Sequence, residues 1–357
     1  MDISKSVLIC LVSRQAMANV IPAVMYKPAK VLLLSTDMEK STAANICSML
    51  NSKSIKCEIF PDILQPYDVT GTEAIISRII ANNQINPGPV LNATGGTKLM
   101  AFAAYNAFRR KKCNIIYCNS EGNNIIQLYP DILHETIEVK ISVEEYLNAY
   151  GYHIIPTKKE SDNSSEFIRY VDGNGLLNSF VKNVNDVRKN NAFKLLSYSH
   201  PLQLGKFLIT RKDDPFISIS HNNNTFTGIH KKFINGFWLE DYFFYKLKLM
   251  NPDDIKSGVH ISAVRKNNLT ELQNENIPYN EIDIVAVKNG RLNLFSCKSG
   301  AKSKEDLFEL EGLRTLAGGT FSKAHTVITK STQFYTNRAK DMKINVIDVQ
   351  NTWSFKL

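Results

Sequence analysis

The sequence has no long hydrophobic run. Its longest apolar stretches, such as Val31 to Leu34, are far shorter than the ~20 apolar residues that a membrane-spanning helix needs. Residues 1–6 lead into a strand-like segment at 7–12 without a small-residue cleavage site, so we expect no signal peptide. We therefore predict a cytoplasmic protein that does not bind membranes.

Clusters of cysteine and histidine are also missing. The six cysteines lie singly among apolar neighbours, and the seven histidines show no metal-ligand spacing. This scatter is typical of reduced thiols in a core and argues against a zinc site or a disulfide framework. The cysteines are Cys10, Cys47, Cys57, Cys113, Cys118 and Cys297.

The composition is that of a folded protein with an uneven charge. The chain has 357 residues, of which 43% are hydrophobic and 22% charged, which excludes disordered and low-complexity classes and favours two domains. Of the net charge of +9, residues 1–150 contribute +1 and residues 151–357 contribute +8. The second part therefore presents either a surface for a polyanion or a solvated basic face, and charge alone does not decide between them.

The first 130 residues alternate strand and helix patterns. This alternation predicts βαβ crossovers and a doubly wound, Rossmann-like α/β domain over residues 1–150. The expected strands are 6–12, 30–35, 55–60, 88–92 and 113–118, and the expected helices are 15–26, 38–51, 71–82, 96–111 and 142–150.

The remainder divides into a connector and a second domain. Residues 157–165 are polar and predict a linker, while 166–233 combine a helical pattern with a strand-like run at 216–220, so the fold of 151–232 stays unassigned. Residues 233–357 predict a mixed α/β domain. Its expected helices are 233–250, 303–316 and 333–341, and its expected strands are 258–264, 280–287, 291–297, 325–329 and 345–349.

Ligands of doubly wound sheets bind beyond the carboxyl ends of the strands. The loops at those ends are polar and rich in hydrogen-bond donors. The ligand-binding candidates in them are Ser13, Arg14, Gln15, Thr36, Asn92, Thr94, Gly95, Gly96, Thr97, Lys98 and Asn119.

The loop over residues 92–98 is the most specific of these. Gly95 and Gly96 permit a sharp turn that presents successive N–H groups, Thr94 or Thr97 caps the next helix, and Lys98 adds a positive charge. The loop lacks the spacings G-x-x-x-x-G-K-[ST] and G-x-G-x-x-G, which disfavours nucleoside triphosphates and dinucleotides. A phosphate site is one interpretation, and a tight turn with a helix cap is the other.

This loop, together with residues 13–15, 19–22 and 27–28, resembles CARF domains, the CRISPR-associated Rossmann-fold sensors of type III systems. The resemblance implies a cyclic oligoadenylate, such as cyclic tetra-adenylate, bound across a homodimer. A ring with an even number of identical units has a two-fold axis that such a dimer can share.

The second domain contains a predicted hairpin around Asn289-Gly290. A turn at these two residues places Asp283 opposite Ser296 and Glu281 opposite Lys298. All four side chains then project from one face, an arrangement suited to metal-dependent phosphodiester cleavage. The alternative is a cross-strand ion pair between Glu281 and Lys298 with Asp283 solvated.

Glu240, in the expected helix 233–250, is a candidate third metal ligand or an ordinary surface carboxylate. Glu240, Asp283 and Lys298, in this order, resemble the PD-(D/E)xK nuclease fold. The resemblance implies Mg²⁺ or Mn²⁺ at Glu240 and Asp283, with the Cys297 carbonyl as a further ligand and Lys298 assisting attack by water.

One position departs from that motif, because Ser296 stands where a carboxylate is usual. Three interpretations stay open: the site binds metal more weakly, Glu281 supplies the missing carboxylate, or the site is catalytically impaired. The predicted function is a homodimeric endonuclease for DNA or RNA, activated by cyclic oligoadenylate. Two alternatives stay open: a nucleic-acid-binding regulator that does not cleave, and a ring nuclease that degrades its own ligand.

Overall fold

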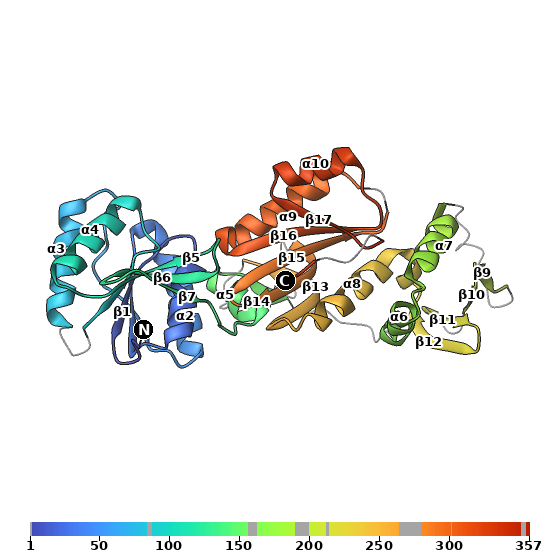
Figure 1. Ribbon diagram of the computed structural model, residues 1–357, viewed down its shortest axis with the longest axis horizontal. Coiled ribbons are helices and arrows are strands. Elements are labelled where there is room, and N and C mark those ends of the chain that lie inside the picture. The colour runs from blue at the N-terminus through green and yellow to red at the C-terminus, as the bar shows by residue number, and fades with distance from the viewer. Residues whose placement is uncertain are drawn as a thin grey trace.

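The computed structural model describes residues 2–83, 88–155, 163–189, 200–211, 214–263, 280–300, 302–350 and 355–357. Its three sheets lie in a row along the long axis of the molecule (Figure 1). The N-terminal sheet lies at one end, and the chain then builds the sheet at the opposite end before it completes the sheet in the middle (Figure 1). The connector region therefore lies beyond the C-terminal domain and does not separate the other two.

The N-terminal sheet has seven strands in the order β3-β2-β1-β4-β5-β6-β7. The first five are parallel to one another, as the alternating pattern predicts, and the β6–β7 hairpin adds antiparallel strands that the sequence did not indicate. The strands are β1 (Val7–Leu11), β2 (Lys30–Leu34), β3 (Cys57–Ile59), β4 (Val90–Asn92), β5 (Ile115–Asn119), β6 (Asn124–Tyr129) and β7 (Leu133–Thr136).

Helices cover both faces of this sheet, which is why β1 is buried along nearly its whole length. One face packs against α1 (Met17–Tyr26), α2 (Lys40–Ser52) and α5 (Val143–Ala149), and the other against α3 (Val69–Asn82) and α4 (Lys98–Arg110). A short 3₁₀ turn, η1 (Asp37–Glu39), precedes α2. The predicted Rossmann-like architecture is confirmed.

The middle sheet has six strands in the order β17-β16-β15-β14-β13-β8. A π-helical turn, η3 (Phe233–Phe237), leads into α8 (Trp238–Leu249), which packs on one face, whereas α9 (Lys304–Ala317) and α10 (Gln333–Asp341) pack on the other (Figure 1). A second 3₁₀ turn, η6 (Gly319–Phe321), follows α9. The strands are β8 (His153–Ile155), β13 (Asp254–Ser262), β14 (Asn280–Lys288), β15 (Arg291–Lys298), β16 (Ser322–Ile328) and β17 (Ile344–Asp348).

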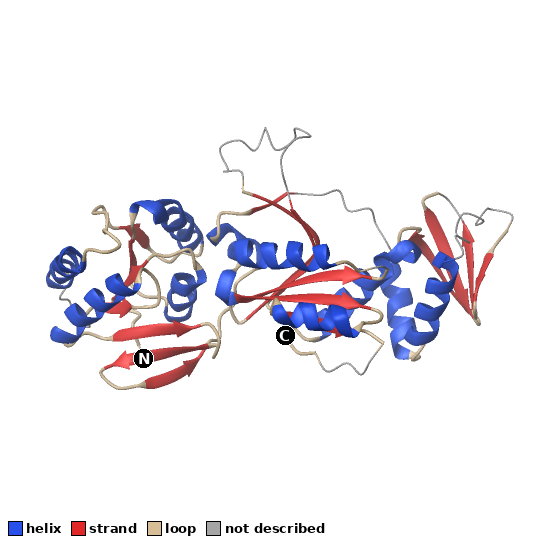
Figure 2. Cartoon of the chain, turned by 90° about the horizontal axis from the view of Figure 1, so that it is seen from above, coloured by secondary structure: helices blue, strands red, loops and turns tan. Residues whose placement is uncertain are grey.

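The connector region forms a helical pair and a small sheet at the end of the molecule (Figure 2) and shares a hydrophobic core with α8. It consists of α6 (Ser164–Gly173), α7 (Leu177–Lys189) and an antiparallel sheet in the order β12-β11-β10-β9. Its strands are β9 (Leu202–Leu204), β10 (Phe207–Arg211), β11 (Phe216–His221) and β12 (Asn224–His230). The strand expected at 216–220 is present as β11, while residues 157–162 of the expected linker lie outside the described residues.

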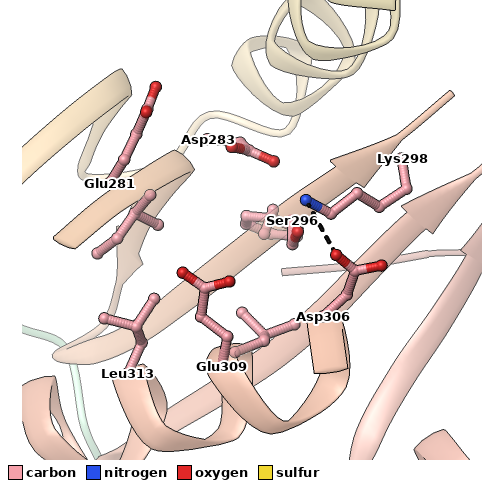
Figure 3. A pocket seen from close by; sticks show the side chains of 10 residues that line it. Glu281, Asp283, Ser296, Lys298, Asp306, Glu309 and Leu313 are labelled. Carbon is pink, nitrogen blue, oxygen red and sulfur yellow. Dashed lines mark ion pairs between the residues drawn. The ribbon is translucent and has the colours of Figure 1, made fainter. Parts of the chain in front are cut away.

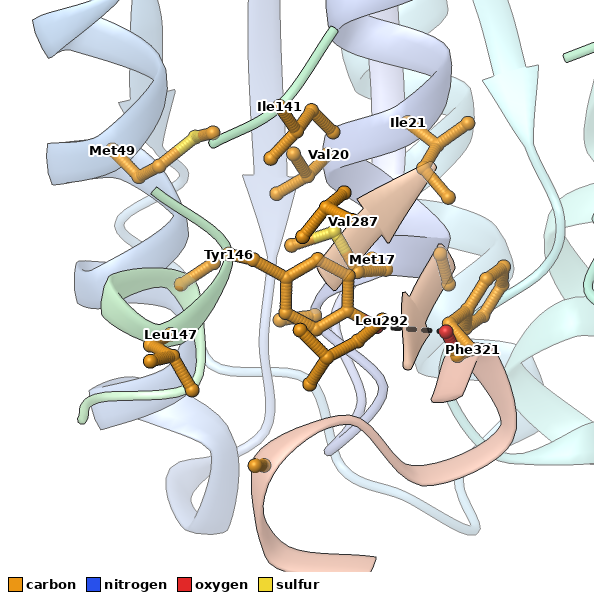
Figure 4. Packing of buried hydrophobic residues seen from close by; sticks show 14 of the residues in the cluster. Met17, Val20, Ile21, Met49, Ile141, Tyr146, Leu147, Val287, Leu292 and Phe321 are labelled. Atoms are coloured by element: carbon orange, nitrogen blue, oxygen red, sulfur yellow. Dashed lines mark hydrogen bonds between the residues drawn. The ribbon is translucent and has the colours of Figure 1, made fainter. Parts of the chain in front are cut away.

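The N-terminal domain and the middle sheet share one hydrophobic core (Figure 4). Tyr146 of α5 is fully buried and donates a hydrogen bond to the Phe321 carbonyl at 3.0 Å. The tip of the β14–β15 hairpin packs closely against α1. A Cβ atom added at Gly290 would lie only 3.0 Å from the Ile21 side chain. The two domains therefore pack against each other through one continuous core.

Two further expectations concern membranes and thiols. Among the described residues, no helix is long and apolar enough to cross a membrane. All six cysteines are free, and four of them are buried, as the scattered spacing predicts.

Candidate functional sites

A cavity of about 690 Å³ opens beside the loop between β4 and α4. Five of the predicted ligand-binding residues line it, namely Thr94, Gly95, Gly96, Thr97 and Lys98. The Thr97 hydroxyl accepts a hydrogen bond from the Met100 N–H at 3.2 Å and so caps α4. The start of a capped helix presents free N–H groups and a positive dipole end, which favour an anion at this edge.

Both glycines of the loop are required by the backbone. A Cβ at Gly95 would clash with the Leu11 carbonyl, and Gly96 has φ of +74°, which side chains disfavour. The loop therefore runs directly against the end of β1. This close approach explains why a Gly-Gly pair occurs at this turn.

Asn92 anchors the loop through hydrogen bonds. Its side chain is fully buried, donates to the Ala18 carbonyl at 2.8 Å and accepts from Thr94. Thr94 in turn accepts from the Cys118 N–H at 2.7 Å. Asn92 thus fixes the loop to α1 and β5, and a direct contact between Asn92 and a ligand stays a prediction.

The other predicted ligand residues surround the same sheet edge outside this cavity. Arg14 is exposed and lies 3.8 Å from Glu39, Thr36 is buried, and Asn119 donates to Asn124 at 3.0 Å within the β5–β6 turn. The Ser13 hydroxyl accepts from the Gln15 N–H at 3.4 Å. The Gln15 side chain points to the other domain, where its Oε1 accepts from the Thr320 N–H at 2.9 Å.

Sequence reasoning missed the aromatic side of the cavity. Phe102 and Tyr105 of α4 and Tyr117 of β5 line it, and 64% of Phe102 and 40% of Tyr117 are exposed. Phe102 and Tyr105 follow Lys98 by four and seven residues, a spacing that places all three on one helical face. The same spacing is typical of a core face, so these aromatic residues could not be told apart from buried ones by their pattern.

The second cavity, of about 160 Å³, lies beside the β14–β15 hairpin. The register confirms the predicted turn, because Ile284 pairs with Phe295 and Lys288 with Arg291. Glu281, Asp283, Ser296 and Lys298 line this cavity together, facing Asp306 and Glu309 of α9 (Figure 3). The structure thus brings together the four side chains that the hairpin pattern placed on one face.

Asp283 is held in position by the neighbouring strand. It accepts a hydrogen bond from the Cys297 N–H at 2.6 Å. Burial raises the pKa of Asp283, although this N–H and Lys298 oppose the shift. Burial lowers the pKa of Lys298, but Asp283 and Asp306 outweigh it, so that this pKa ends above its usual value. Lys298 is a cation within the cavity and lies 3.5 Å from Asp306.

Glu240 lies in the first turn of α8 and is not among the residues that line the cavity. Burial, with Asp283, Asp241 and Glu281 adding repulsion, raises the pKa of Glu240 to about 8. Lys298 opposes this shift, and the carboxylates of the site outnumber this positive charge. Glu240 is half-buried, and its role as a metal ligand stays a prediction.

The donor set suits a hard divalent cation. Carboxylate and carbonyl oxygens are the ligands that Mg²⁺ and Mn²⁺ prefer, and Mg²⁺ usually takes one or two carboxylates and completes its shell with water. Within the described part of the chain, no three His, Cys, Asp or Glu side chains are grouped closely enough to hold one ion. The chemistry of the lining nevertheless fits an ion that takes one or two carboxylates and completes its shell with backbone or water oxygens.

Two family models match the chain. Residues 7–146 match the Card1 CARF domain, and residues 228–356 match the Card1-like endonuclease domain. The chain carries a CARF domain joined to a Card1-like endonuclease domain. The resemblance of the 92–98 loop to CARF domains is confirmed, and so is the presence of a C-terminal nuclease domain. No curated protein sequence matches the chain.

Solved structures share this fold at low sequence identity. Can2 from Sulfobacillus thermosulfidooxidans, solved in complex with cyclic tetra-adenylate, is 23% identical with a TM-score of 0.70, and the match covers 97% of this chain and 94% of Can2. Protein VC1899 from Vibrio cholerae is 17% identical, also with a TM-score of 0.70, over 96% of this chain and 94% of its own. A type III CRISPR defence DNA nuclease activated by cyclic oligoadenylate is 18% identical with a TM-score of 0.58; the match covers 91% of this chain and 45% of that nuclease.

Proposed function

We propose that this chain is a metal-dependent endonuclease of type III CRISPR defence that cleaves DNA or RNA when a cyclic oligoadenylate binds its CARF domain. The observation that carries the proposal is the presence of two different cavities in domains that hydrogen-bond directly to each other. One cavity lies at a capped helix start and suits phosphates, and the other combines carboxylates with Lys298. A cytoplasmic location accords with such an activity.

Cyclic tetra-adenylate is the activator that we propose. Its phosphates would bind the N–H groups of Gly95 and Gly96 and the Lys98 ammonium. Its adenines would stack on Phe102, Tyr105 or Tyr117, because base–aromatic stacking contributes about 1–3 kcal/mol per base. Can2, whose fold this chain shares, was solved with this ring.

The active form that we propose is a homodimer. Phe102, Leu99 and Tyr117 present an exposed apolar surface beside the cavity, which a second copy would cover. A two-fold ring placed between two such surfaces contacts the same loop twice. The ring then favours the paired arrangement of the two chains, and with it the paired arrangement of their nuclease domains.

In the cleavage reaction, Asp283, Glu240 and the Cys297 carbonyl would hold Mg²⁺ or Mn²⁺. Such an ion, when bound, lowers the pKa of water and polarises the phosphate. The Cys297 N–H keeps the Asp283 carboxylate oriented. Lys298 stays protonated, so it stabilises the negative charge that develops on the phosphate and orients the attacking water.

Contacts between the domains support allosteric activation. Gln15, beside the ligand loop, accepts hydrogen bonds from both the N–H and the hydroxyl of Thr320, directly after α9. Arg291, at the start of β15, donates to the Ser120 carbonyl at the carboxyl end of β5. A shift of the ligand loops would therefore move α9 and β15, the two elements that flank the cavity around Lys298.

The test is an incubation of the purified protein with Mn²⁺, cyclic tetra-adenylate and labelled DNA or RNA, in which both the nucleic acid and the ring are followed. The proposal expects cleavage of the nucleic acid that requires both metal and ring. Ser296 replaces the usual carboxylate and is the feature that favours a regulator. Binding of nucleic acid without cleavage would support that alternative. Loss of the ring alone would favour a ring nuclease.

A further inference from the structure

The cavity beside Lys298 contains a carboxylate that the motif does not assign. Glu309 lies on α9 one turn after Asp306, and its carboxylate points into the cavity, toward the strands that carry Asp283 and Ser296 (Figure 3). Ser296 provides only a hydroxyl at this point. On the side of the cavity that α9 covers, Glu309 is therefore placed to supply a negative oxygen.

The other carboxylates of α9 have partners. Asp306 accepts from the Ser303 N–H at 2.8 Å and pairs with Lys298 at 3.5 Å, Glu311 pairs with Arg314 at 2.6 Å, and Glu305 lies 3.9 Å from Lys304. Within the described residues, Glu309 forms neither an ion pair nor a hydrogen bond. Lys298 is the cation that its charge acts on, and this lysine already pairs with Asp306, so one ammonium group serves several carboxylates of the cavity.

Glu281, one of the substitutes that the sequence left open, is placed differently. It lies opposite His260 of β13, whose Nε2 is 3.8 Å from its carboxylate, and 55% of its side chain is exposed. Both glutamates are exposed, but Glu281 has His260 as a partner, whereas the Glu309 carboxylate points toward the strands that border the cavity (Figure 3).

Two carboxylates that face one cavity repel each other, and a divalent cation between them removes this repulsion. We propose that Glu309 supplies the carboxylate that Ser296 lacks and binds the divalent cation together with Asp283. This inference rests on the proposed metal-dependent function. It refines that proposal by pairing Asp283 with Glu309, which lines the cavity, in place of Glu240, which does not. Glu309 lies on α9, and the turn η6 that follows this helix contacts Gln15 of the CARF domain through Thr320.

The test measures Mn²⁺ binding by full-length protein, with free Mn²⁺ followed by electron paramagnetic resonance. Glu309→Gln should weaken Mn²⁺ binding by about tenfold or more, as loss of a charged ligand does. Glu305→Gln, on the same exposed helix but outside the cavity, is the matched control and should bind like wild type. Glu281→Gln should change the affinity little. Adding Ser296→Glu to Glu309→Gln should restore binding, because both carboxylates would serve the same ion.

Each outcome decides the assignment. Wild-type affinity in Glu309→Gln, with a circular dichroism spectrum that shows an intact fold, would overturn the role of Glu309 alone. Weak binding in Glu281→Gln with normal binding in Glu309→Gln would transfer the role to Glu281. A wild-type protein that binds no Mn²⁺ and cleaves no nucleic acid would overturn the proposed function as well.

Discussion

The two cavities of this chain differ in size, charge and lining. The CARF cavity, of about 690 Å³, is lined by a loop of small residues, one lysine and aromatic side chains. The endonuclease cavity, of about 160 Å³, is lined by four carboxylates and one lysine. The first suits a large anion with flat bases, and the second a small cation with one phosphate. The proposed ligand-binding and cleavage sites therefore differ in the chemistry of their linings and lie far apart in the sequence.

The largest effect should follow from removing the charge of Asp283. Asp283→Asn should lower ligand-stimulated cleavage at least about 100-fold, because it removes a proposed metal ligand while keeping the shape. The affinity for cyclic tetra-adenylate should not change, since that cavity lies in the other domain. Cleavage rates and calorimetric titration of the same preparation check both statements.

Lys298→Ala should act in the same direction on cleavage, with Lys304→Ala as the exposed control on the neighbouring helix. Cleavage that survives both Asp283→Asn and Lys298→Ala would place the reaction elsewhere.

The next effect concerns the ligand cavity. Lys98→Ala should weaken cyclic tetra-adenylate binding by roughly 10- to 100-fold, since a hydrogen bond between charged groups contributes about 1.5–3 kcal/mol. Isothermal titration measures this, and Lys111→Ala, just beyond the far end of α4, serves as control. An unchanged affinity would locate the phosphates away from the Gly-Gly loop.

A smaller effect is expected from a substitution that weakens the contact between the domains and leaves both cavities intact. Thr320→Val removes the hydroxyl that donates to Gln15 and leaves the loop backbone in place. It should reduce the stimulation by ligand about fivefold, within the usual range of allosteric coupling, while ligand affinity and unstimulated cleavage stay near wild type. Equal stimulation in variant and wild type would show that this contact transmits nothing.

The smallest effect is on stability and depends on pH. Burial and neighbouring carboxylates raise the pKa of Glu240 to about 8, so the folded state prefers the protonated form. The stabilisation that protonated Glu240 gives is fully present below about pH 4.5, the usual pKa of a glutamate, and is lost as the pH rises through 8. Glu240→Gln should therefore raise Tm by roughly 5 °C at pH 8.5 and hardly at all at pH 4.5.

Thermal melts of the metal-free protein check this prediction. Mn²⁺ added at pH 8.5 should stabilise the wild type more than Glu240→Gln, because the ion compensates the carboxylate charge. A Tm difference that does not vary with pH would contradict a raised pKa of Glu240.

Local signals explain what the sequence could predict. Asn289-Gly290 determines the hairpin turn, and through the two-residue alternation of strands it also places Asp283 beside Ser296 and Lys298. The Gly-Gly loop is equally local, because Gly95 lies where only a hydrogen fits against the Leu11 carbonyl. In both cases the prediction depends only on a few residues that are close together in the sequence.

The rest depends on packing between distant segments. Glu305, Glu309 and Glu311 are equivalent by sequence, and the docking of α9 on the sheet selects which one faces the cavity. The Gln15–Thr320 contact joins residues 305 positions apart, so no window of sequence contains it. For the same reason, the fold of 151–232 and the addition of β8 to the middle sheet did not follow from periodicity.

The most direct test of the account is a titration of cleavage activity with cyclic tetra-adenylate at a protein concentration far above the dissociation constant. The account predicts that cleavage of labelled nucleic acid in the presence of Mn²⁺ rises with added ring and stops rising at one ring per two chains. A plateau at one ring per chain would contradict the shared site, and cleavage that does not respond to the ring would contradict activation through the CARF domain.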